Sequence, residues 1–275
     1  MSEGTAPPNR WRRLLLTLLI ASIAIYIVLI GAIYAAQGRL IYPAPKAPGS
    51  DVPGFETISY PTSDGLELRA GFRPARPGMP TILYFHGNGA HWQSSVMAND
   101  RLVAEGYGLF AAEYRGYRGN PGKPDEQGLY RDGRAAIAWL RARGVEPGQL
   151  MIAGNSLGAG VAAQMAVEHT PHALVLVSPF TSLPRIRSER MPWAPVDWLL
   201  RDRYANDEKI GDVAAPILLL HGDADTLIPP HHSRILAKAN PDAKLLIVGQ
   251  VGHQLAWSDE AKLATLAFLE SLSPR

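Results

Sequence analysis

Six short apolar runs, separated by longer stretches, constrain the fold of this chain more than any other feature of its sequence. Each run is almost continuously hydrophobic, as is typical of strands buried on both faces of a parallel sheet. Three of the intervening stretches, 129–141, 156–168 and 258–272, have clear helical patterns. Strands that alternate with helices predict an α/β protein with right-handed crossovers. The runs cover residues 81–85, 108–112, 150–153, 173–177, 216–220 and 244–248.

A hairpin is predicted ahead of these runs. Residues 55–60 and 66–72 alternate between apolar and polar side chains, and an Asp-Gly turn at Asp64 and Gly65 joins them. The sheet therefore has eight predicted strands, most of them parallel. Because ligands of such sheets bind beyond the carboxyl ends of the strands, we expect functional residues directly after the apolar runs.

The composition excludes several classes of function. With 47% hydrophobic residues among 275, the chain suits one globular domain plus a short extra segment. Its 27 basic residues are dispersed among 25 acidic ones, so we expect no nucleic-acid partner. The absence of cysteine rules out disulfides, thiolate metal sites and cysteine nucleophiles. No nucleotide, flavin or metal motif is present, and we expect no cofactor and no metal.

Residues 14–36 form an uncharged apolar segment near the N-terminus. At ~1.5 Å per helical residue the segment is long enough to cross a bilayer, which predicts a single transmembrane helix. A cleaved signal peptide is the alternative, but its apolar core would be shorter, and Tyr34 makes a poor cleavage site. Three arginines precede the segment at positions 10, 12 and 13, which favours a cytoplasmic N-terminus.

These observations predict the domain organisation. We expect a cytoplasmic tail at 1–13, the transmembrane helix at 14–36, a stiff proline-containing linker at 37–54 and a catalytic domain at 55–275. In a bacterial source that domain would lie in the periplasm, held by a single span of the inner membrane. Residues 179–213 contain apolar side chains among arginines, and they form either a short amphipathic lid or ordinary packing.

A serine follows the apolar run 150–153, in the sequence Gly154-Asn155-Ser156-Leu157-Gly158. A Gly-x-Ser-x-Gly pentapeptide is a weak signal alone, but here it follows a buried strand and opens a helix of small residues, as a nucleophile elbow requires. The helix N-terminus favours developing negative charge. Serine is a poor nucleophile near neutral pH, so it needs a base that a third group orients.

His253 is the candidate base, because it lies in a glycine-flanked loop after the last apolar run. The candidate acids are Asp225 and Asp223, which follow the run 216–220; Asp223 is the one that could merely cap the turn. Seven other histidines fit this role less well. Six of them precede strand-end glycines (His86, His221), flank a surface turn (His169, His172) or begin an exposed helical stretch (His231, His232).

An oxyanion hole is the last requirement of this chemistry. The backbone N–H of Leu157, directly after the serine, is one expected donor, and Asn88 in the loop after the run 81–85 is the expected source of the second.

Together these motifs resemble a known family. The chain is similar to the membrane-anchored, Bem46-like α/β hydrolases, within the larger group of serine aminopeptidase (S33) and lysophospholipase-like hydrolases. The resemblance implies an α/β-hydrolase fold and a triad of Ser156, Asp225 and His253. Asn155 and Arg118 depart from the pattern without removing a catalytic group. The motifs are Leu40-Ile41-Tyr42-Pro43, Phe85-His86-Gly87-Asn88, Glu113-Tyr114-Arg115-Gly116-Tyr117, Gly154-Asn155-Ser156-Leu157-Gly158, Ser178-Pro179-Phe180, His221-Gly222-Asp223-Ala224-Asp225 and Gly252-His253.

The sequence therefore predicts a membrane-anchored serine hydrolase that forms an acyl-enzyme on Ser156. Its expected substrates are small carboxylic esters, thioesters or lysophospholipids, because the anchor keeps the site near lipid. Two alternatives stay open. An amidase or peptidase would use the same triad, and a membrane-tethered binding protein could use the same scaffold without catalysis.

Overall fold

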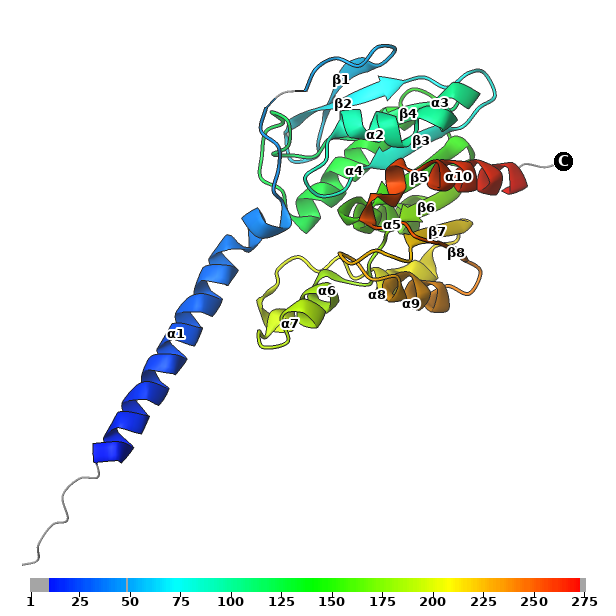
Figure 1. Ribbon diagram of the computed structural model, residues 1–275. Coiled ribbons are helices and arrows are strands. Elements are labelled where there is room, and N and C mark those ends of the chain that lie inside the picture. Colours follow the sequence, from blue (N-terminus) through cyan, green and yellow to red (C-terminus); the bar gives the residue numbers. More distant parts are fainter. Residues whose placement is uncertain (1–9, 48, 273–275) are drawn as a thin grey trace, which may run out of the picture.

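The computed structural model describes residues 10–47 and 49–272 (Figure 1). Most of the predicted cytoplasmic tail, residues 1–9, lies outside the described residues.

An eight-stranded sheet forms the centre of the molecule, with the order β1-β2-β4-β3-β5-β6-β7-β8. β1 and β2 pair antiparallel, as do β2 and β4, and every other pairing is parallel. The predicted eight-stranded, mostly parallel sheet is confirmed. The strands are β1 (Glu56–Pro61), β2 (Glu67–Arg73), β3 (Thr81–Phe85), β4 (Gly108–Ala111), β5 (Leu150–Asn155), β6 (Ala173–Val177), β7 (Ile217–Gly222) and β8 (Lys244–Val248).

Two details of the strands differ from the prediction. β5 continues to Asn155, which pairs with Val177, so the strand runs up to the candidate serine. β8 is not buried on both faces: its residues alternate between exposed and half-buried. β8 has a strand neighbour only on the β7 side, and this edge position leaves one of its sides open.

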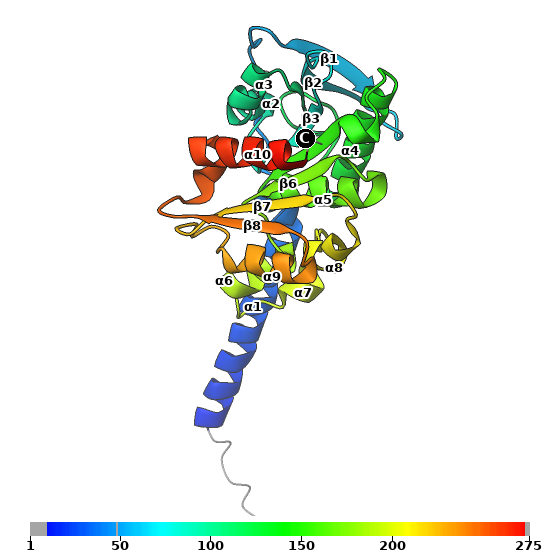
Figure 2. The ribbon, with the colours of Figure 1, turned by 90° about the vertical axis from the view of Figure 1, so that its right-hand side faces the viewer.

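Helices cover both faces of the sheet and enclose two hydrophobic cores. On one face lie α4 (Glu126–Arg141), α5 (Leu157–His169) and α9 (His231–Ala239). On the other lie α2 (Trp92–Ala98), α3 (Asp100–Glu105) and α10 (Asp259–Leu272). Figure 2 looks onto the β8 edge, with α10 and α5 on opposite sides of the sheet. Neighbouring residues such as Ile82 and Leu83 enter opposite cores because side chains alternate along a strand.

The N-terminal helix α1 (Arg10–Ile41) extends away from the sheet as a single rod (Figure 1). Its most apolar window is entirely exposed, and the helix is long and apolar enough to cross a membrane. It runs past the predicted end at Ala36, and Gln37, Ile41 and Tyr42 are buried against the domain. The first part of the expected linker is therefore a docked helix end.

A short helical insertion, here called the cap, lies between β6 and β7, in the region 179–213 that the sequence left open as either a lid or ordinary packing. It consists of α6 (Leu183–Arg190), α7 (Val196–Leu199), α8 (Asn206–Lys209) and a 3₁₀ turn at Ile210–Asp212; further 3₁₀ turns occur at Pro147–Gln149 and His253–Trp257. The cap adjoins α1. The Tyr26 hydroxyl donates to the carbonyl of Trp193 (3.0 Å), and the backbone N–H of Arg201 donates to Oε1 of Gln37 (3.1 Å).

Candidate active site

Ser156 occupies the sharp turn between β5 and α5. Its backbone has φ 53° and ψ −118°, a left-handed conformation that is rare for residues other than glycine. The turn needs small neighbours: a Cβ on Gly154 would overlap the backbone of Gly158, and a Cβ on Gly158 would overlap the carbonyl of Phe85. The two glycines of the motif thus allow a strained turn that presents the serine at the sheet edge.

The three candidate triad residues form one chain of hydrogen bonds. His253 Nε2 lies 3.0 Å from Ser156 Oγ, and His253 Nδ1 lies 2.7 Å from Asp225 Oδ2. The residues follow β5, β7 and β8, whose carboxyl ends meet at one edge of the sheet. The structure thus brings together a nucleophile, a base and an orienting acid with the geometry that general-base activation requires.

The surroundings of Asp225 favour its charged form. The side chain is fully buried, and its Oδ1 accepts hydrogen bonds from the backbone N–H groups of Leu227 and Ile228, both at 2.9 Å. Burial by itself would raise the pKa of Asp225, but contacts with His221, His253 and the Ile228 N–H outweigh it and hold the pKa well below its usual range. The acid therefore remains a carboxylate, and its Oδ2 accepts a hydrogen bond from Nδ1–H of His253.

Asp223, the other candidate acid, is exposed and has other contacts. Its Oδ1 accepts a hydrogen bond from the backbone N–H of Gln250 (2.6 Å). This contact ties the loop after β7 to the loop after β8. The carboxylate of Asp223 supports the turn, whereas that of Asp225 contacts His253.

Both expected oxyanion-hole residues line the same cavity as Ser156. Leu157 is the first residue of α5, and the first N–H groups of a helix have no partner within the helix. Asn88 lies in the loop after β3, and its Oδ1 accepts a hydrogen bond from the Tyr117 hydroxyl (3.3 Å). The arrangement has a helix N-terminus on one side of the serine and the β3 loop on the other.

Glu113 and Tyr114 belong to a motif that the sequence showed only as part of the family resemblance, and the structure shows what these two side chains contact. Glu113 is buried and pairs with Nε2 of His86 (2.7 Å), and its second oxygen accepts from the backbone N–H of Trp92 (3.1 Å). The Tyr114 hydroxyl donates to the carbonyl of His86 (2.8 Å). These bonds hold the start of the Asn88 loop. Only the tertiary pairing of β3 with β4 reveals them.

The cavity above Ser156 has a volume of about 110 Å³. The cap helix α6 forms one wall, which includes Arg187 and Arg190. The C-terminal end of α1 contributes Ile41, a residue that sequence reasoning did not place in the site. The other lining residues are mostly apolar: Leu157, Phe180, Leu183, Ile186, Leu227 and Ile228, together with Asn88 and Ser156.

A larger apolar cavity of about 280 Å³ adjoins the first, between α1 and the cap. Ile41 and Arg187 line both cavities. The outer cavity is otherwise formed by residues of α1 (Ile33, Tyr34, Gln37, Leu40) and of the cap (Met191, Ala194, Val196, Leu199, Leu200). The two cavities thus share part of their lining between the side of α1 and the serine.

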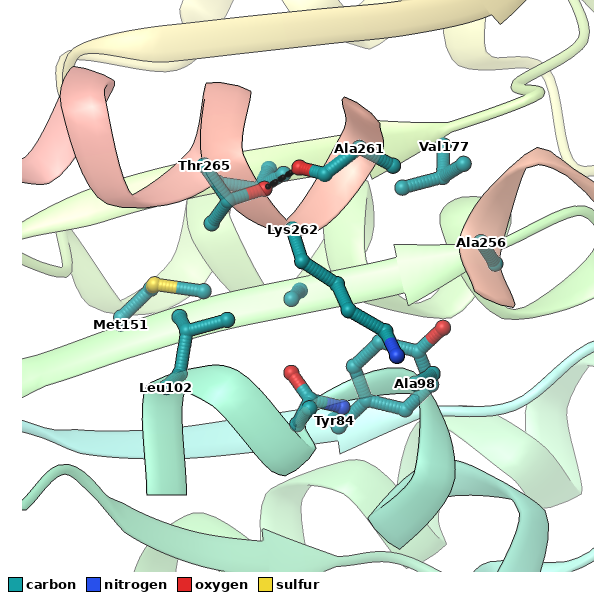
Figure 3. Close-up of a pocket in the computed structure, with 12 residues that line it drawn as sticks. Tyr84, Ala98, Leu102, Met151, Val177, Ala256, Ala261, Lys262 and Thr265 are labelled. Atoms are coloured by element: carbon teal, nitrogen blue, oxygen red, sulfur yellow. Dashed lines mark hydrogen bonds between the residues drawn. The ribbon is translucent and has the colours of Figure 1, made fainter. Parts of the chain in front are cut away.

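Figure 3 shows a third cavity, of about 20 Å³, enclosed between the sheet and α3 and α10. Lys262 extends into it from α10, and Thr265 donates a hydrogen bond to the carbonyl of Ala261 (2.8 Å). None of its lining residues belongs to the candidate triad or the oxyanion hole. Its size and place are those of a packing void.

One group of side chains outside the triad could hold a metal ion. Among the residues that the structure describes, Glu189, His231 and His232 place one potential ligand atom each within 4.8 Å of one another. The expectation that both histidines begin an exposed stretch is wrong for His232, which is completely buried. The cap helix α6 covers it, and the sequence gives no sign of that contact.

Comparison with known proteins places these features in context. The sequence pattern of the family described as serine aminopeptidase, S33, matches residues 79–200. The uncharacterized protein Rv2307c of Mycobacterium tuberculosis is 38% identical over 256 residues, which cover 89% of each chain. Lysophosphatidylserine lipase ABHD12 of Danio rerio is 33% identical over 174 residues, covering 54% of this chain and 44% of that protein.

A solved structure with a similar fold is the Pyrococcus furiosus esterase Pf2001. It aligns with a TM-score of 0.67 over 84% of this chain and 98% of the esterase, at 18% sequence identity. At this identity the likeness concerns the fold.

Proposed function

This chain belongs to the serine aminopeptidase S33-like family of α/β hydrolases, and from that premise we propose that it is a membrane-anchored serine hydrolase of carboxylic esters. The observation that carries the proposal is the hydrogen-bonded chain from Asp225 through His253 to Ser156, at the floor of an apolar cavity. Acyl transfer through a serine uses this combination of groups.

In the proposed mechanism His253 Nε2 takes the proton of Ser156 Oγ as the oxygen attacks the carbonyl carbon of the ester. The negative charge that develops on the carbonyl oxygen is stabilised by the N–H of Leu157 and by a donor from the Asn88 loop. His253 then gives its proton to the leaving alkoxide, and the acyl group stays on Ser156. The buried carboxylate of Asp225 stabilises the imidazolium formed in between.

The second half of the reaction releases the acyl group. Water gives a proton to His253 Nε2 and attacks the acyl carbon. The intermediate then collapses, His253 returns the proton to Ser156 Oγ, and a carboxylic acid leaves. Loss of one oxyanion donor costs about 2.7 to 4 kcal/mol in such transition states. The expected donors at Asn88 and Leu157 are backbone groups, so Asn88→Ala need not abolish activity.

We propose esters of fatty acyl chains, lysophospholipids among them, as the substrate class. The two adjoining cavities have apolar walls suited to an acyl chain, and the outer one is formed in part by α1 itself. The relative ABHD12 of Danio rerio is a lysophosphatidylserine lipase, which agrees with a lipid ester. Thioesters fit the same walls and the same mechanism.

We further propose that α1 anchors the protein in a bilayer with its N-terminus in the cytoplasm. Its apolar stretch is exposed throughout, which suits contact with lipid. Arg10, Arg12 and Arg13 precede that stretch, whereas Arg39 alone lies at the end of the helix. The catalytic domain would then lie on the periplasmic side of a bacterial inner membrane.

The first test is covalent labelling with a fluorophosphonate probe. We expect the wild-type chain to react and Ser156→Ala to remain unlabelled while keeping its fold. A folded wild type that does not react would contradict the proposal and favour a non-catalytic binding protein.

Hydrolysis rates then separate the substrate classes. A series of nitrophenyl esters of increasing acyl length, a lysophospholipid and a matched acyl amide would be compared. Preference for the long esters supports the proposed class, whereas faster turnover of the amide would identify an amidase or peptidase.

A further inference from the structure

Three metal-ligating side chains meet where the cap contacts the sheet domain, outside the triad. Glu189 lies in the last turn of α6, and His231 and His232 open α9. His231 Nε2 is 3.0 Å from Oε1 of Glu189, and His232 Nε2 is 3.3 Å from Oε2. Two ligands of one tetrahedral ion at ~2.0 to 2.1 Å are themselves about 3.3 Å apart, so these atoms are already close to the required spacing.

The buried histidine of this group has an unused ring nitrogen. His232 is 0% exposed, and its Nε2 has no hydrogen-bond partner of acceptable geometry among the described residues. This nitrogen lies 3.3 Å from Oε2 of Glu189. A metal ion binds the lone pair of an unprotonated imidazole nitrogen.

The other ring nitrogen of His232 contacts Thr181. Nδ1 accepts a hydrogen bond from the backbone N–H of Thr181 (3.4 Å), and it lies 3.0 Å from the hydroxyl oxygen of the same residue. This hydroxyl oxygen can accept a hydrogen bond from Nδ1 once an ion takes the place of the proton on Nε2. Contacts of the second ring nitrogen fix the orientation of the imidazole, as they do in histidine metal ligands.

We propose that Glu189, His231 and His232 form a binding site for a divalent transition-metal ion that ties the cap helix α6 to α9. Two imidazoles and one carboxylate are the donor set that Zn²⁺ and its neighbours in the first transition row prefer. His231 is 45% exposed on its side chain, so the ion can enter from solvent and keep water at its open position. Arg185, whose Nε lies 3.5 Å from Glu189, is also exposed and can move aside.

Besides the proposed metal site, α6 is joined to the loop after β7 by Arg190. The Arg190 guanidinium donates to the carbonyls of Thr226 and Leu227, each at 2.7 Å. α6 also supplies Ile186 and Arg187 to the wall of the Ser156 cavity. A bound ion would therefore hold the cap closed over that cavity and stabilise the folded chain.

The test uses the full-length chain in detergent micelles after removal of metals with a chelator. Zn²⁺ is titrated calorimetrically, and Co²⁺ is titrated with its visible absorption as an independent readout of coordination. We expect one ion per chain and a rise in the unfolding midpoint of about 5 °C at saturating Zn²⁺. Neither readout depends on catalysis, so failure of this proposal and failure of the proposed hydrolase activity are distinguishable.

Variants assign the ion to its ligands. His231→Ala and Glu189→Gln alter partly exposed side chains, so both should fold, and each should weaken Zn²⁺ binding at least about tenfold. His172→Ala, at the position just before β6 and outside this group, is the matched control and should bind Zn²⁺ like the wild type. Absence of Zn²⁺ binding, or binding that both ligand variants leave unchanged, would overturn the proposal.

Discussion

Asp225 and Asp223 lie two positions apart in one loop, yet their carboxylates have opposite surroundings. Asp225 is buried and contacts His253, whereas Asp223 is exposed and accepts a bond from the backbone of Gln250. Burial strengthens the electrostatic interaction between the Asp225 carboxylate and the His253 imidazole, because no water screens it. The proposed roles of the two residues can therefore be separated by the same substitution at each position.

We predict that Asp225→Asn lowers kcat by about 10⁴-fold, since the amide would favour the wrong tautomer of His253. Asp223→Asn keeps the oxygen that accepts from Gln250, and its kcat should stay within about twofold of the wild type. Steady-state hydrolysis of a nitrophenyl ester by both variants is the measurement. Equal losses at the two positions would contradict the proposed assignment of the acid.

The hydroxyl of Tyr60 has no hydrogen-bond partner among the described residues, although the side chain is fully buried. Burial, followed by the charges of Asp132 and Glu113, raises the pKa of Tyr60 well above its usual value. The folded chain thus keeps this proton above pH 10, where the unfolded chain releases it. Titration of this group therefore leaves stability unchanged below about pH 10, and above it the folded chain loses stability as the pH rises.

We predict that Tyr60→Phe raises the free energy of unfolding at pH 7 by about 1 kcal/mol, because it removes an unsatisfied buried hydroxyl. Above pH 10 the stability of the variant should fall less steeply with pH, by up to ~1.4 kcal/mol per pH unit. Denaturant unfolding between pH 7 and 11 measures both effects.

Tyr130→Phe is the control for the pH 7 effect. The hydroxyl of Tyr130 donates to Glu126 (2.7 Å) and accepts from Lys209 (2.8 Å). Its loss should lower the free energy of unfolding at pH 7 by about 1 kcal/mol. If both tyrosine variants are destabilised equally, the Tyr60 hydroxyl has a partner after all.

At the scale of elements, α1 and the cap together form the walls of the outer cavity. Leu199 of α7 faces α1 across this cavity, and Gln37 of α1 donates a side-chain hydrogen bond to the Leu199 carbonyl (3.4 Å). The pairing joins two elements that are more than 150 positions apart in the chain. Ile41 lines both cavities. An acyl chain that extends past Ile41, beyond the Ser156 cavity, would therefore enter the outer cavity between α1 and the cap.

We predict that Leu199→Trp selectively impairs long substrates, because the indole would fill part of the outer cavity. The kcat/KM for a hexadecanoyl ester should fall at least about tenfold, while that for an acetyl ester stays within about twofold. Leu263→Trp, at an exposed position of α10 outside both cavities, is the matched control. A parallel loss with both esters would argue against an acyl site between α1 and the cap.

At the scale of the whole molecule, α1 has two parts with different environments. Its apolar stretch is exposed, whereas its C-terminal end and the residue after it are buried in the larger of the two cores. The Tyr42 hydroxyl donates to Asp202 (2.8 Å) and lies 3.0 Å from the hydroxyl of Tyr204. The proposed membrane anchor therefore ends inside the folded domain, without a flexible joint.

We predict that a chain beginning at Gln37 is released from the membrane fraction and remains folded, because it keeps Ile41 and Tyr42. A chain beginning at Pro43 loses both buried side chains and should be less stable by at least about 3 kcal/mol. Cell fractionation and denaturant unfolding of the two truncations are the measurements. Equal stability of the two would show that the docked helix end contributes nothing.

Local sequence patterns allowed prediction of the strands and helices and of the functional residues that directly follow the strands. The strand regions, the elbow at Ser156 and the order of serine, aspartate and histidine follow from periodicity and short motifs, because backbone propensities act within a few residues. The edge position of β8 could not be predicted, since strand order arises from pairing between distant segments.

The sequence by itself determined an eight-stranded α/β fold, a long apolar helix and a candidate triad, with two aspartates as candidates for its acid. Only the tertiary structure decided which carboxylate reaches His253, which side chains hold the Asn88 loop, and that Ile41 and the cap enclose the serine. It alone brought Glu189 against His232. The physical reason is that these contacts join residues far apart in the chain, and packing of two cores against one sheet sets their distances.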